Sequence, residues 1–359
     1  MIIVGDIASP TASSSDDLES IFRTHASIFS ANALVCNFEG VISDQISTAT
    51  NTPVLFNHSS VLKALKTANI QVAALANNHT LDLPDCFDET LRHFKEAGIA
   101  ACGAGRSQKE ASESIVFEER GVEIVLFNYC WDFLLYHQKN PSHGVYVSEI
   151  ENLSLIESIG RVRQEKPDAR IVVYLHWSLD LEILPYPMYR KLSMELIDSG
   201  ANLVVGTHSH CVQGGEKYKD GFIVYGLGNF FIPYHEFANG KLAFPEFSRL
   251  EMALEWDPIS QHAVCHWFNY HNDQGHHWLE LSESAPFEES LLLKKYSPYD
   301  QSFNDYVKYF RLNRRKKFLI PVFLDPKATR RNRVMTQLLM YRASFARNLA
   351  KMNIVKWQS

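Results

Sequence analysis

The sequence has few of the features that mark a membrane-spanning, secreted or nucleotide-binding protein. No stretch approaches the roughly 20 uninterrupted apolar residues that a bilayer-spanning helix requires. The first residues lack the basic and apolar regions of a signal peptide, so we expect no export by that route. Neither a Gly-x-Ser-x-Gly nor a Walker motif occurs, and Gly226-Leu227-Gly228 lacks the third glycine of a dinucleotide site.

Cysteine is also sparse, and its spacing excludes two kinds of site. The six cysteines are Cys36, Cys86, Cys102, Cys130, Cys211 and Cys265. They show no paired metal-binding spacing, and most lie within apolar runs, which is typical of free thiols in a reducing compartment. We therefore expect a cytoplasmic protein without a disulfide framework or a cysteine zinc site.

The 359 residues carry an uneven distribution of charge. From Lys308 onward the net charge is +13, whereas the rest of the chain carries −19. A chain of this length exceeds the usual size of one core. We expect a main domain over residues 1–272, followed over residues 273–359 by a polar, irregular segment and a basic, largely helical extension that packs on the core or on a partner.

Apolar, β-branched runs alternate with amphipathic stretches along the main domain. The runs cover residues 2–4, 33–36, 72–75, 99–102, 171–175 and 203–205, and the clearest amphipathic stretches cover 60–68, 87–97 and 188–199. This alternation favours an α/β core in which helices cover a sheet. Beyond Phe247 the pattern changes to alternating strands over 250–256 and 263–269, so we expect the core to close with antiparallel pairing.

Polar residues follow each apolar run at the point where the predicted strand ends. They are Asp6; Asn37 and Glu39; Asn77, Asn78 and His79; His176 and Trp177; His208 and His210; and Asn229. In an open α/β sheet, ligands bind outside the carboxyl ends of the strands, so we expect these loops to converge on one crevice. Carboxylates, amides and imidazoles are ligands for divalent transition metals, which accounts for two histidines at the end of a buried strand.

The order of these motifs resembles a known family. Gly5-Asp6, Asn37-Phe38-Glu39-Gly40, Ala76-Asn77-Asn78-His79, His176-Trp177, Gly206-Thr207-His208-Ser209-His210 and Gly226-Leu227-Gly228-Asn229-Phe230 are similar to the CapA branch of the calcineurin-like metallophosphoesterases. The likeness covers roughly Met1 to Phe231. It implies a four-layer α/β/β/α sandwich and a role in capsule, surface polysaccharide or poly-γ-glutamate biosynthesis.

The resemblance also implies a site. Its metal ligands are Asp6, Glu39, Asn78, His176, His208 and His210, which would hold two divalent ions such as Mn, Fe, Zn or Ca. His79 would donate a proton to the leaving oxygen, and Asp6 belongs to the catalytic set as well. Residues expected to contact substrate are Asn37, Asn77, Arg106, Trp177 and Asn229. The implied reaction is hydrolysis of a phosphoester or a polymer-linked bond, because paired cations can acidify an attacking water.

Two departures from the family pattern leave alternatives open. Ala8 stands where the wider superfamily has a histidine, and Ser178 replaces a usual glycine, with Asp180 as the nearest acid. One alternative is a metal-assisted peptide epimerase on the same site. Another is a non-catalytic factor that binds an anionic polymer or a membrane surface.

The basic extension combines cations with apolar residues. Arg314-Arg315-Lys316-Lys317 precedes Phe318-Leu319-Ile320, and one helical stripe is predicted through Met335, Leu338, Phe345, Leu349 and Met352. This pattern is typical of segments at an anionic membrane surface, which would place the protein peripherally at the inner membrane; packing onto the acidic body is the alternative. No motif for sequence-specific nucleic-acid binding occurs. His276-His277 beside Trp278 is expected to form an exposed loop.

Overall fold

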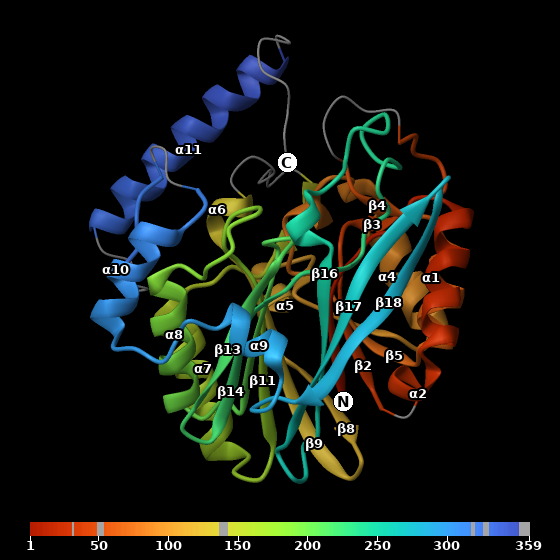
Figure 1. Cartoon of the computed structure of the whole chain (residues 1–359). Coiled ribbons are helices and arrows are strands. Elements are labelled where there is room, and N and C mark those ends of the chain that lie inside the picture. Colours follow the sequence, from red (N-terminus) through yellow and green to blue (C-terminus); the bar gives the residue numbers. More distant parts are fainter. Residues whose placement is uncertain (31, 49–53, 136–142, 317–319, 326–329, 352–359) are drawn as a thin grey trace.

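Two β-sheets pack face to face between two layers of helices, as Figure 1 shows. The computed structural model describes residues 1–30, 32–48, 54–135, 143–316, 320–325 and 330–351. The expected four-layer α/β/β/α sandwich with a helical C-terminal region is confirmed.

The first sheet contains the N-terminal strand near its centre. Its order is β18 (His276–Pro286), β17 (Ala263–Asp273), β16 (Leu250–Trp256), β1 (Ile2–Ile7), β2 (Leu34–Phe38), β5 (Ile70–Ala74) and β6 (Ala100–Cys102). The strands from β1 to β6 run parallel, whereas β16, β17 and β18 pair antiparallel, as the sequence predicts for the end of the core.

The second sheet is formed by the middle of the chain. Its order is β13 (Val212–Tyr218), β14 (Gly221–Leu227), β12 (Leu203–Thr207), β11 (Arg170–His176), β9 (Val122–Cys130) and β8 (Ile115–Glu119). After β14 the chain crosses to the first sheet, where β15 (Asn229–Phe231) pairs parallel with β1 and sets Asn229 opposite Asp6. This crossing joins the two sheets at one end of the sandwich.

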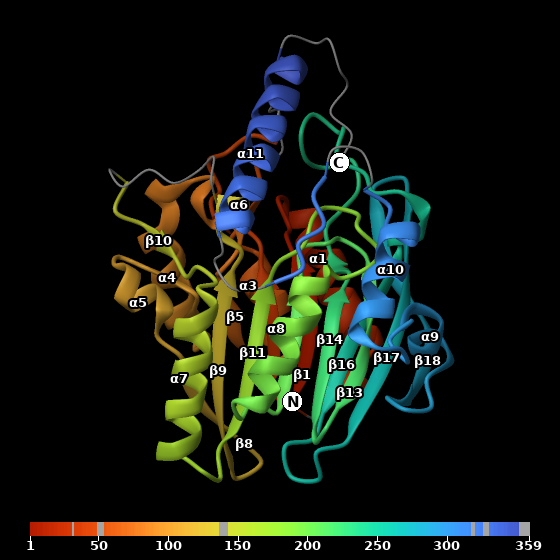
Figure 2. The same ribbon diagram turned by 90° about the vertical axis from the view of Figure 1, so that its left-hand side faces the viewer.

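Helices cover both outer faces. The first sheet is covered by α1 (Ala12–Thr24), α2 (Ala26–Phe29), α3 (Val61–Thr67) and α4 (Phe87–Ala97), and the second by α7 (Asn152–Glu165), α8 (Pro187–Asp198) and α10 (Phe303–Asn313). The last helix, α11 (Arg330–Lys351), stands beyond the ends of the strands (Figure 2). Shorter elements are β3 (Val41–Ile42), β4 (Phe56–Asn57), β7 (Ala104–Gly105), α5 (Gln108–Ser112), α6 (Asp132–Leu135), β10 (Tyr146–Val147) and α9 (Leu291–Tyr296).

Alternation along the strands explains why the central strands read as continuous apolar runs. In β1, Ile2 and Val4 pack against the helices, whereas Ile3 faces the layer between the sheets. In β11, Val173 faces the helices and Val172 faces the other sheet. Successive residues of a strand point to opposite faces, and both faces are buried here.

The segment from Asp273 to Tyr299 was expected to be irregular, and this expectation is wrong. It contains the eleven-residue strand β18 and the helix α9, so the first sheet continues beyond residue 272. The exposed loop predicted around His277 is also wrong, because His277 is buried and its Nδ1 lies 2.6 Å from the hydroxyl of Tyr270. In β18, the buried His277 and Leu279 alternate with exposed residues such as Trp278. Because one of the buried positions is a histidine, the apolar residues alone do not show the two-residue period of a strand.

The basic extension forms α10 and α11, but not with the expected single stripe. Met335 packs toward the second sheet, whereas Leu338 and Phe345 are exposed. The side chain of Leu349 and the whole of Met352 lie outside the described residues. No helix within the described ranges is long and apolar enough to cross a membrane.

Candidate metal centre

The strands of both sheets bring the six expected ligands to one end of the sandwich. Asp6 lies in β1, Glu39 follows β2, and Asn78 begins the short 3-10 helix Asn78–Leu81 after β5. His176 ends β11, and His208 and His210 follow β12. Parallel strands end at the same edge of a sheet, so residues far apart in sequence meet there.

A first group of ligand atoms comes from Asp6, Glu39 and His176. One ligand atom from each lies within 4.8 Å of the other two, and all three side chains are fully buried. The Oδ1 atom of Asn78 lies 2.8 Å from Nε2 of His176 and adds a neutral oxygen to the group. Two carboxylates, one amide and one imidazole thus converge on a small volume.

A second group adjoins the first and consists of Asp180, His208 and His210. Their ligand atoms also lie within 4.8 Å of one another, and Oδ1 of Asp180 is 3.1 Å from Nε2 of His208. The ring of His208 lies 4.6 Å from that of His176 and 5.6 Å from that of His210, between centroids. The six residues of the two groups therefore form one continuous cluster.

Several buried atoms of this cluster lack hydrogen-bond partners among the described residues. They are Oδ2 of Asp6, Oε2 of Glu39 and Nδ1 of His208. Buried carboxylates and imidazoles are costly unless hydrogen bonds or a cation compensate for the lost water. Carboxylate oxygens and imidazole nitrogens that lie close together without hydrogen-bond partners are suited to bind divalent cations.

Burial shifts the pKa values of the two acids and of the histidine in the first ligand group. A bound cation would oppose the shift of the acids, whereas the shift of the histidine favours binding. Burial raises the pKa of Asp6, and it raises the pKa of Glu39 well above its ordinary value, to which the Asp6 carboxylate adds. Burial also lowers the pKa of His176 far below its usual value, with His208 and His210 adding to the effect. A neutral imidazole is the form that binds metal, and cations would offset the repulsion between the acids.

Two asparagines hold the ligands in place. Asn37 donates from Nδ2 to Oδ1 of Asp6 over 2.8 Å, and the same amide lies 3.3 Å from Oε1 of Glu39. Asn229 places its Oδ1 2.7 Å from Nδ1 of His210. Both asparagines are buried and hold the ligands in position. Their predicted contact with substrate stays a prediction.

His79 lies at the edge of the cluster beside an acid of its own helix turn. Its Nδ1 is 2.6 Å from Oδ2 of Asp82, and its side chain is 14% exposed. Burial lowers the pKa of the ring, but the Asp82 carboxylate, with Glu39 and Asp180 adding to its effect, raises it to about 9. The Asp82 contact therefore favours a protonated ring, in which Nδ1 contacts Asp82 and Nε2 does not.

Three residues of this site have left-handed backbones that side chains seldom adopt. The φ angle is +82° at His208, +52° at His210 and +79° at Ser178. Such angles cost about 1–2 kcal/mol at residues other than glycine and persist where the surrounding structure enforces them. The angle at Ser178 is one that glycine adopts at no steric cost. The two left-handed histidines are members of the second ligand group.

The other three residues expected to contact substrate are engaged by protein groups. Asn77 is fully buried and caps the 3-10 helix through its Oδ1, which accepts from the amides of His79 and Thr80. Trp177 is a core residue that donates to the carbonyl of Tyr225. Both side chains are enclosed by protein, so their contact with substrate stays a prediction.

Arg106 is also bound elsewhere. Its Nε donates to Asp88 over 2.9 Å, and its guanidinium donates to the carbonyls of His143 and Gly144. These contacts hold the side chain in a surface network outside the metal cluster, so the prediction that it contacts substrate is not supported.

Sequence reasoning missed two residues of the site. Asp180 joins the second ligand group, although it was noted only as the nearest acid after His176. Asp82 was not assigned, although its position three residues after His79 in a helical turn is a signal for contact. Ala8, which follows β1, lies in the hydrophobic core with residues of the helices that cover the first sheet.

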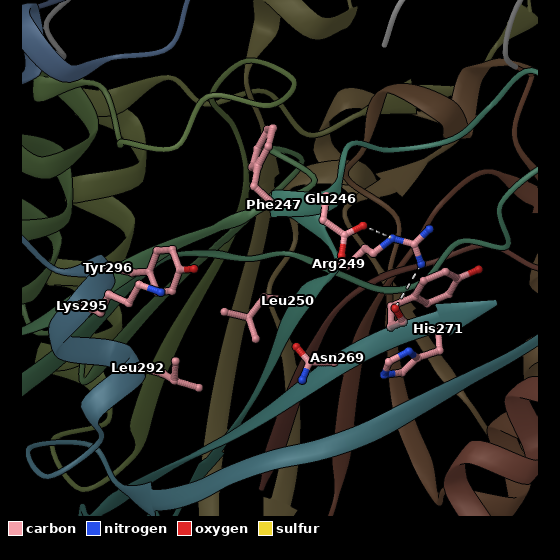
Figure 3. Close-up of a pocket in the computed structure, with 10 residues that line it drawn as sticks. Glu246, Phe247, Arg249, Leu250, Asn269, His271, Leu292, Lys295 and Tyr296 are labelled. Atoms are coloured by element: carbon pink, nitrogen blue, oxygen red, sulfur yellow. Dashed lines mark hydrogen bonds and ion pairs between the residues drawn. The ribbon is translucent and has the colours of Figure 1, made fainter.

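A separate groove of about 360 Å³ lies where the start of β16 and the end of β17 meet α9 (Figure 3). It is lined by Glu246, Phe247, Arg249, Leu250, Asn269, Tyr270, His271, Leu292, Lys295 and Tyr296. None of these residues belongs to the ligand cluster, so the groove and the candidate metal centre are different places on the molecule.

Comparison with known proteins gives a family match over the part of the chain that carries the cluster. The family model described as bacterial capsule synthesis protein PGA_cap matches residues 1–234. The capsule biosynthesis protein CapA of Bacillus anthracis is 30% identical over 172 residues, which cover 47% of this chain and 42% of that protein. The PGA biosynthesis protein CapA of Bacillus subtilis (strain 168) is 30% identical over 219 residues, or 59% of this chain and 56% of that protein.

The chain thus spans about half the length of these curated relatives. Among solved structures, the 5'-nucleotidase precursor of Thermus thermophilus aligns with 86% of this chain and 54% of its own. That alignment has a TM-score of 0.39 and 16% sequence identity.

Proposed function

Because the chain belongs to the PGA_cap family of bacterial capsule synthesis proteins, we propose that it is a metal-dependent hydrolase that acts during assembly of a capsule or of poly-γ-glutamate. Its target would be a phosphoester or a polymer-linked bond. The capsule and PGA biosynthesis proteins among its relatives support a role in polymer assembly. The chemistry of the ligand cluster supports metal-dependent hydrolysis as the reaction.

The observation that carries this proposal is the pair of adjoining ligand groups with unpartnered buried atoms. Asp6, Glu39, Asn78 and His176 would hold one divalent cation, and Asp180, His208 and His210 a second. When bound, such cations supply the Lewis acidity that polarises a phosphoryl or carbonyl group and activates water at neutral pH.

The protein's own part in the reaction centres on His79. Its Nδ1 is held by Asp82, so Nε2 is the atom that can donate a proton to the leaving oxygen. A positioned acid of this kind contributes about 10²–10⁴-fold to rate. Asn37 and Asn229 keep Asp6 and His210 in fixed orientations, so the cluster does not have to rearrange during the reaction.

Metal content and turnover, measured together, test the proposal. Protein purified without chelator should contain Mn, Fe, Zn or Ca by mass spectrometry, and it should hydrolyse bis(p-nitrophenyl) phosphate or a polyglutamate substrate. His208→Ala and Glu39→Gln should each lower metal content and abolish turnover. His262→Ala replaces an exposed histidine outside the cluster and should change neither.

Each contrary result has a distinct meaning. No bound metal and no activity with added metal would exclude the hydrolase. Deuterium incorporation into a peptide substrate without hydrolysis would assign the site to epimerisation instead. Bound metal without any turnover of either kind would favour a non-catalytic binding role.

A further inference from the structure

The helix α11 has two apolar faces, and only one of them packs on the protein. On the inner face, Leu339 is 2% exposed and lies with Met335 in the core that covers the second sheet. The outer face carries four large apolar side chains, with exposed fractions of 49% for Val334, 59% for Leu338, 75% for Tyr341 and 65% for Phe345.

These four residues, here called the outer stripe, form one continuous line. Their spacings of four, three and four residues place them on the same side of an α-helix, over three turns. Exposed apolar side chains are common singly, but a row along one helix marks an interaction surface. The outer stripe therefore has a partner that the chain itself does not supply among its described residues.

The charge of the helix identifies the chemistry of that partner. Residues 330–351 contain six Arg and Lys and no Asp or Glu. Arg330 and Arg331 are exposed at the start of the helix. A helix that combines an apolar stripe with cations and contains no acid fits the surface of an anionic bilayer, where the apolar side chains enter the headgroup boundary.

The position of the helix agrees with a surface contact. Figure 2 shows α11 standing beyond the sheets, at the end of the molecule where β9 and β11 finish. Figure 1 shows it along one outer side, next to α10. His176 is the last residue of β11, so α11 and the candidate metal centre occupy the same end of the sandwich.

We propose that the outer stripe of α11 docks this protein on an anionic phospholipid bilayer, with the helix lying in the plane of the surface. Two other occupants fit the observations less well. A soluble polyanion would match the arginines but would leave four apolar side chains in water. A second copy of α11 would match the stripe but would bring a second set of six cations against the first.

Vesicle sedimentation of the full-length protein tests this proposal. The protein should bind vesicles of phosphatidylcholine containing about one-third phosphatidylglycerol, bind pure phosphatidylcholine at least about tenfold more weakly, and be released at about 1 M salt. Leu338→Ser with Phe345→Ser, and separately Arg330→Gln with Arg331→Gln, should each weaken binding by at least about tenfold.

A matched control removes apolar side chains of similar exposure elsewhere. Val116→Ser with Ile259→Ser changes residues that are 48% and 52% exposed outside α11, and it should leave vesicle binding unchanged. Circular dichroism of every variant checks that the fold is retained.

Three outcomes would overturn the proposal. One is equal binding to anionic and neutral vesicles, or none to either. A second is full binding after loss of Leu338 and Phe345. The third is a dimer in lipid-free sedimentation equilibrium that these two substitutions dissociate, which would show that a second copy covers the stripe.

Discussion

The Nδ1 atom of His79 lies 2.6 Å from Oδ2 of Asp82, and this contact leaves Nε2 as the ring nitrogen that Asp82 does not engage. The same Asp82 oxygen accepts from the backbone amide of Leu55 over 3.0 Å, so the acid is itself held in place. A leaving group would therefore meet a ring whose orientation is already set.

Asp82→Asn should lower the turnover number by about 10–100-fold, a part of the roughly 10²–10⁴-fold that a positioned general acid contributes to rate, because the His79 ring loses the carboxylate that orients it. Metal content should stay unchanged, since Asp82 is not among the ligand groups. Asp85→Asn changes an exposed acid in the same segment and serves as the control. Turnover as fast as that of the unmodified protein would remove His79 from the proposed acid role.

Removing metal should lower thermal stability. A cation that binds only the folded state stabilises it by about 2.7 kcal/mol at a free concentration of 100 Kd. We expect a higher Tm with added Mn²⁺ than with EDTA in differential scanning calorimetry, and a much smaller difference in Asp6→Asn with His210→Ala. An equal Tm shift in that double variant would place the stabilising ions outside this cluster.

Stability should fall at low pH through Glu19 on α1. Its contacts with Lys63 and Arg23 lower the pKa of this carboxyl to about 2, below its ordinary value of 4.5. A lowered folded-state pKa means that the stabilisation is present above about pH 4.5 and is lost as the pH falls toward 2.

Urea unfolding from pH 6 to pH 3, with EDTA present throughout to exclude metal loss, measures this effect. Glu19→Gln should be less stable than the unmodified protein at pH 6, and the gap should narrow toward pH 3. A gap that does not change with pH would contradict the assignment.

Gly206 is tightly enclosed beside the ligand cluster. A Cβ atom at this position would lie 2.2 Å from Nε1 of Trp177 and from the carbonyl oxygen of Tyr225. Gly206→Ala should therefore destabilise the protein by about 1–3 kcal/mol or more through overpacking. Urea unfolding gives the value directly.

Gly160→Ala is the matched control with the opposite expected sign. Gly160 lies inside α7, and a Cβ atom there would meet nothing within 4 Å. Alanine should stabilise the helix by about 0.5–1 kcal/mol because it restricts the unfolded chain. Similar effects of the two substitutions would show that space at Gly206 is not the deciding factor.

The α/β class and the ligand types were predictable from the sequence for a local reason. Buried strands read as apolar runs, and the polar residue that ends each run is visible without knowing the fold, as with Val4 before Asp6 or Val205 before His208. The strand β18 was not predicted, because His277 occupies an inward position that apolar residues normally take.

The sequence did not show which residues near the site are enclosed by protein and which are open to a substrate. Trp177 directly follows the ligand His176, yet it turns into the core because successive residues of an extended chain point to opposite sides. Asn37 and Asn229 look equally suitable for binding substrate, but their partners, Asp6 and His210, lie 31 and 19 residues away.

The sequence by itself determined which residue types are available at the strand ends and in what order, because hydrophobic periodicity and motif spacing are local properties. Only the tertiary structure decided that Asp180 joins His208 and His210, that Asn78 meets His176 across 98 residues, and that α11 turns one apolar face outward. These relations depend on how two sheets pack and on left-handed backbone turns at single residues, and no local pattern encodes either.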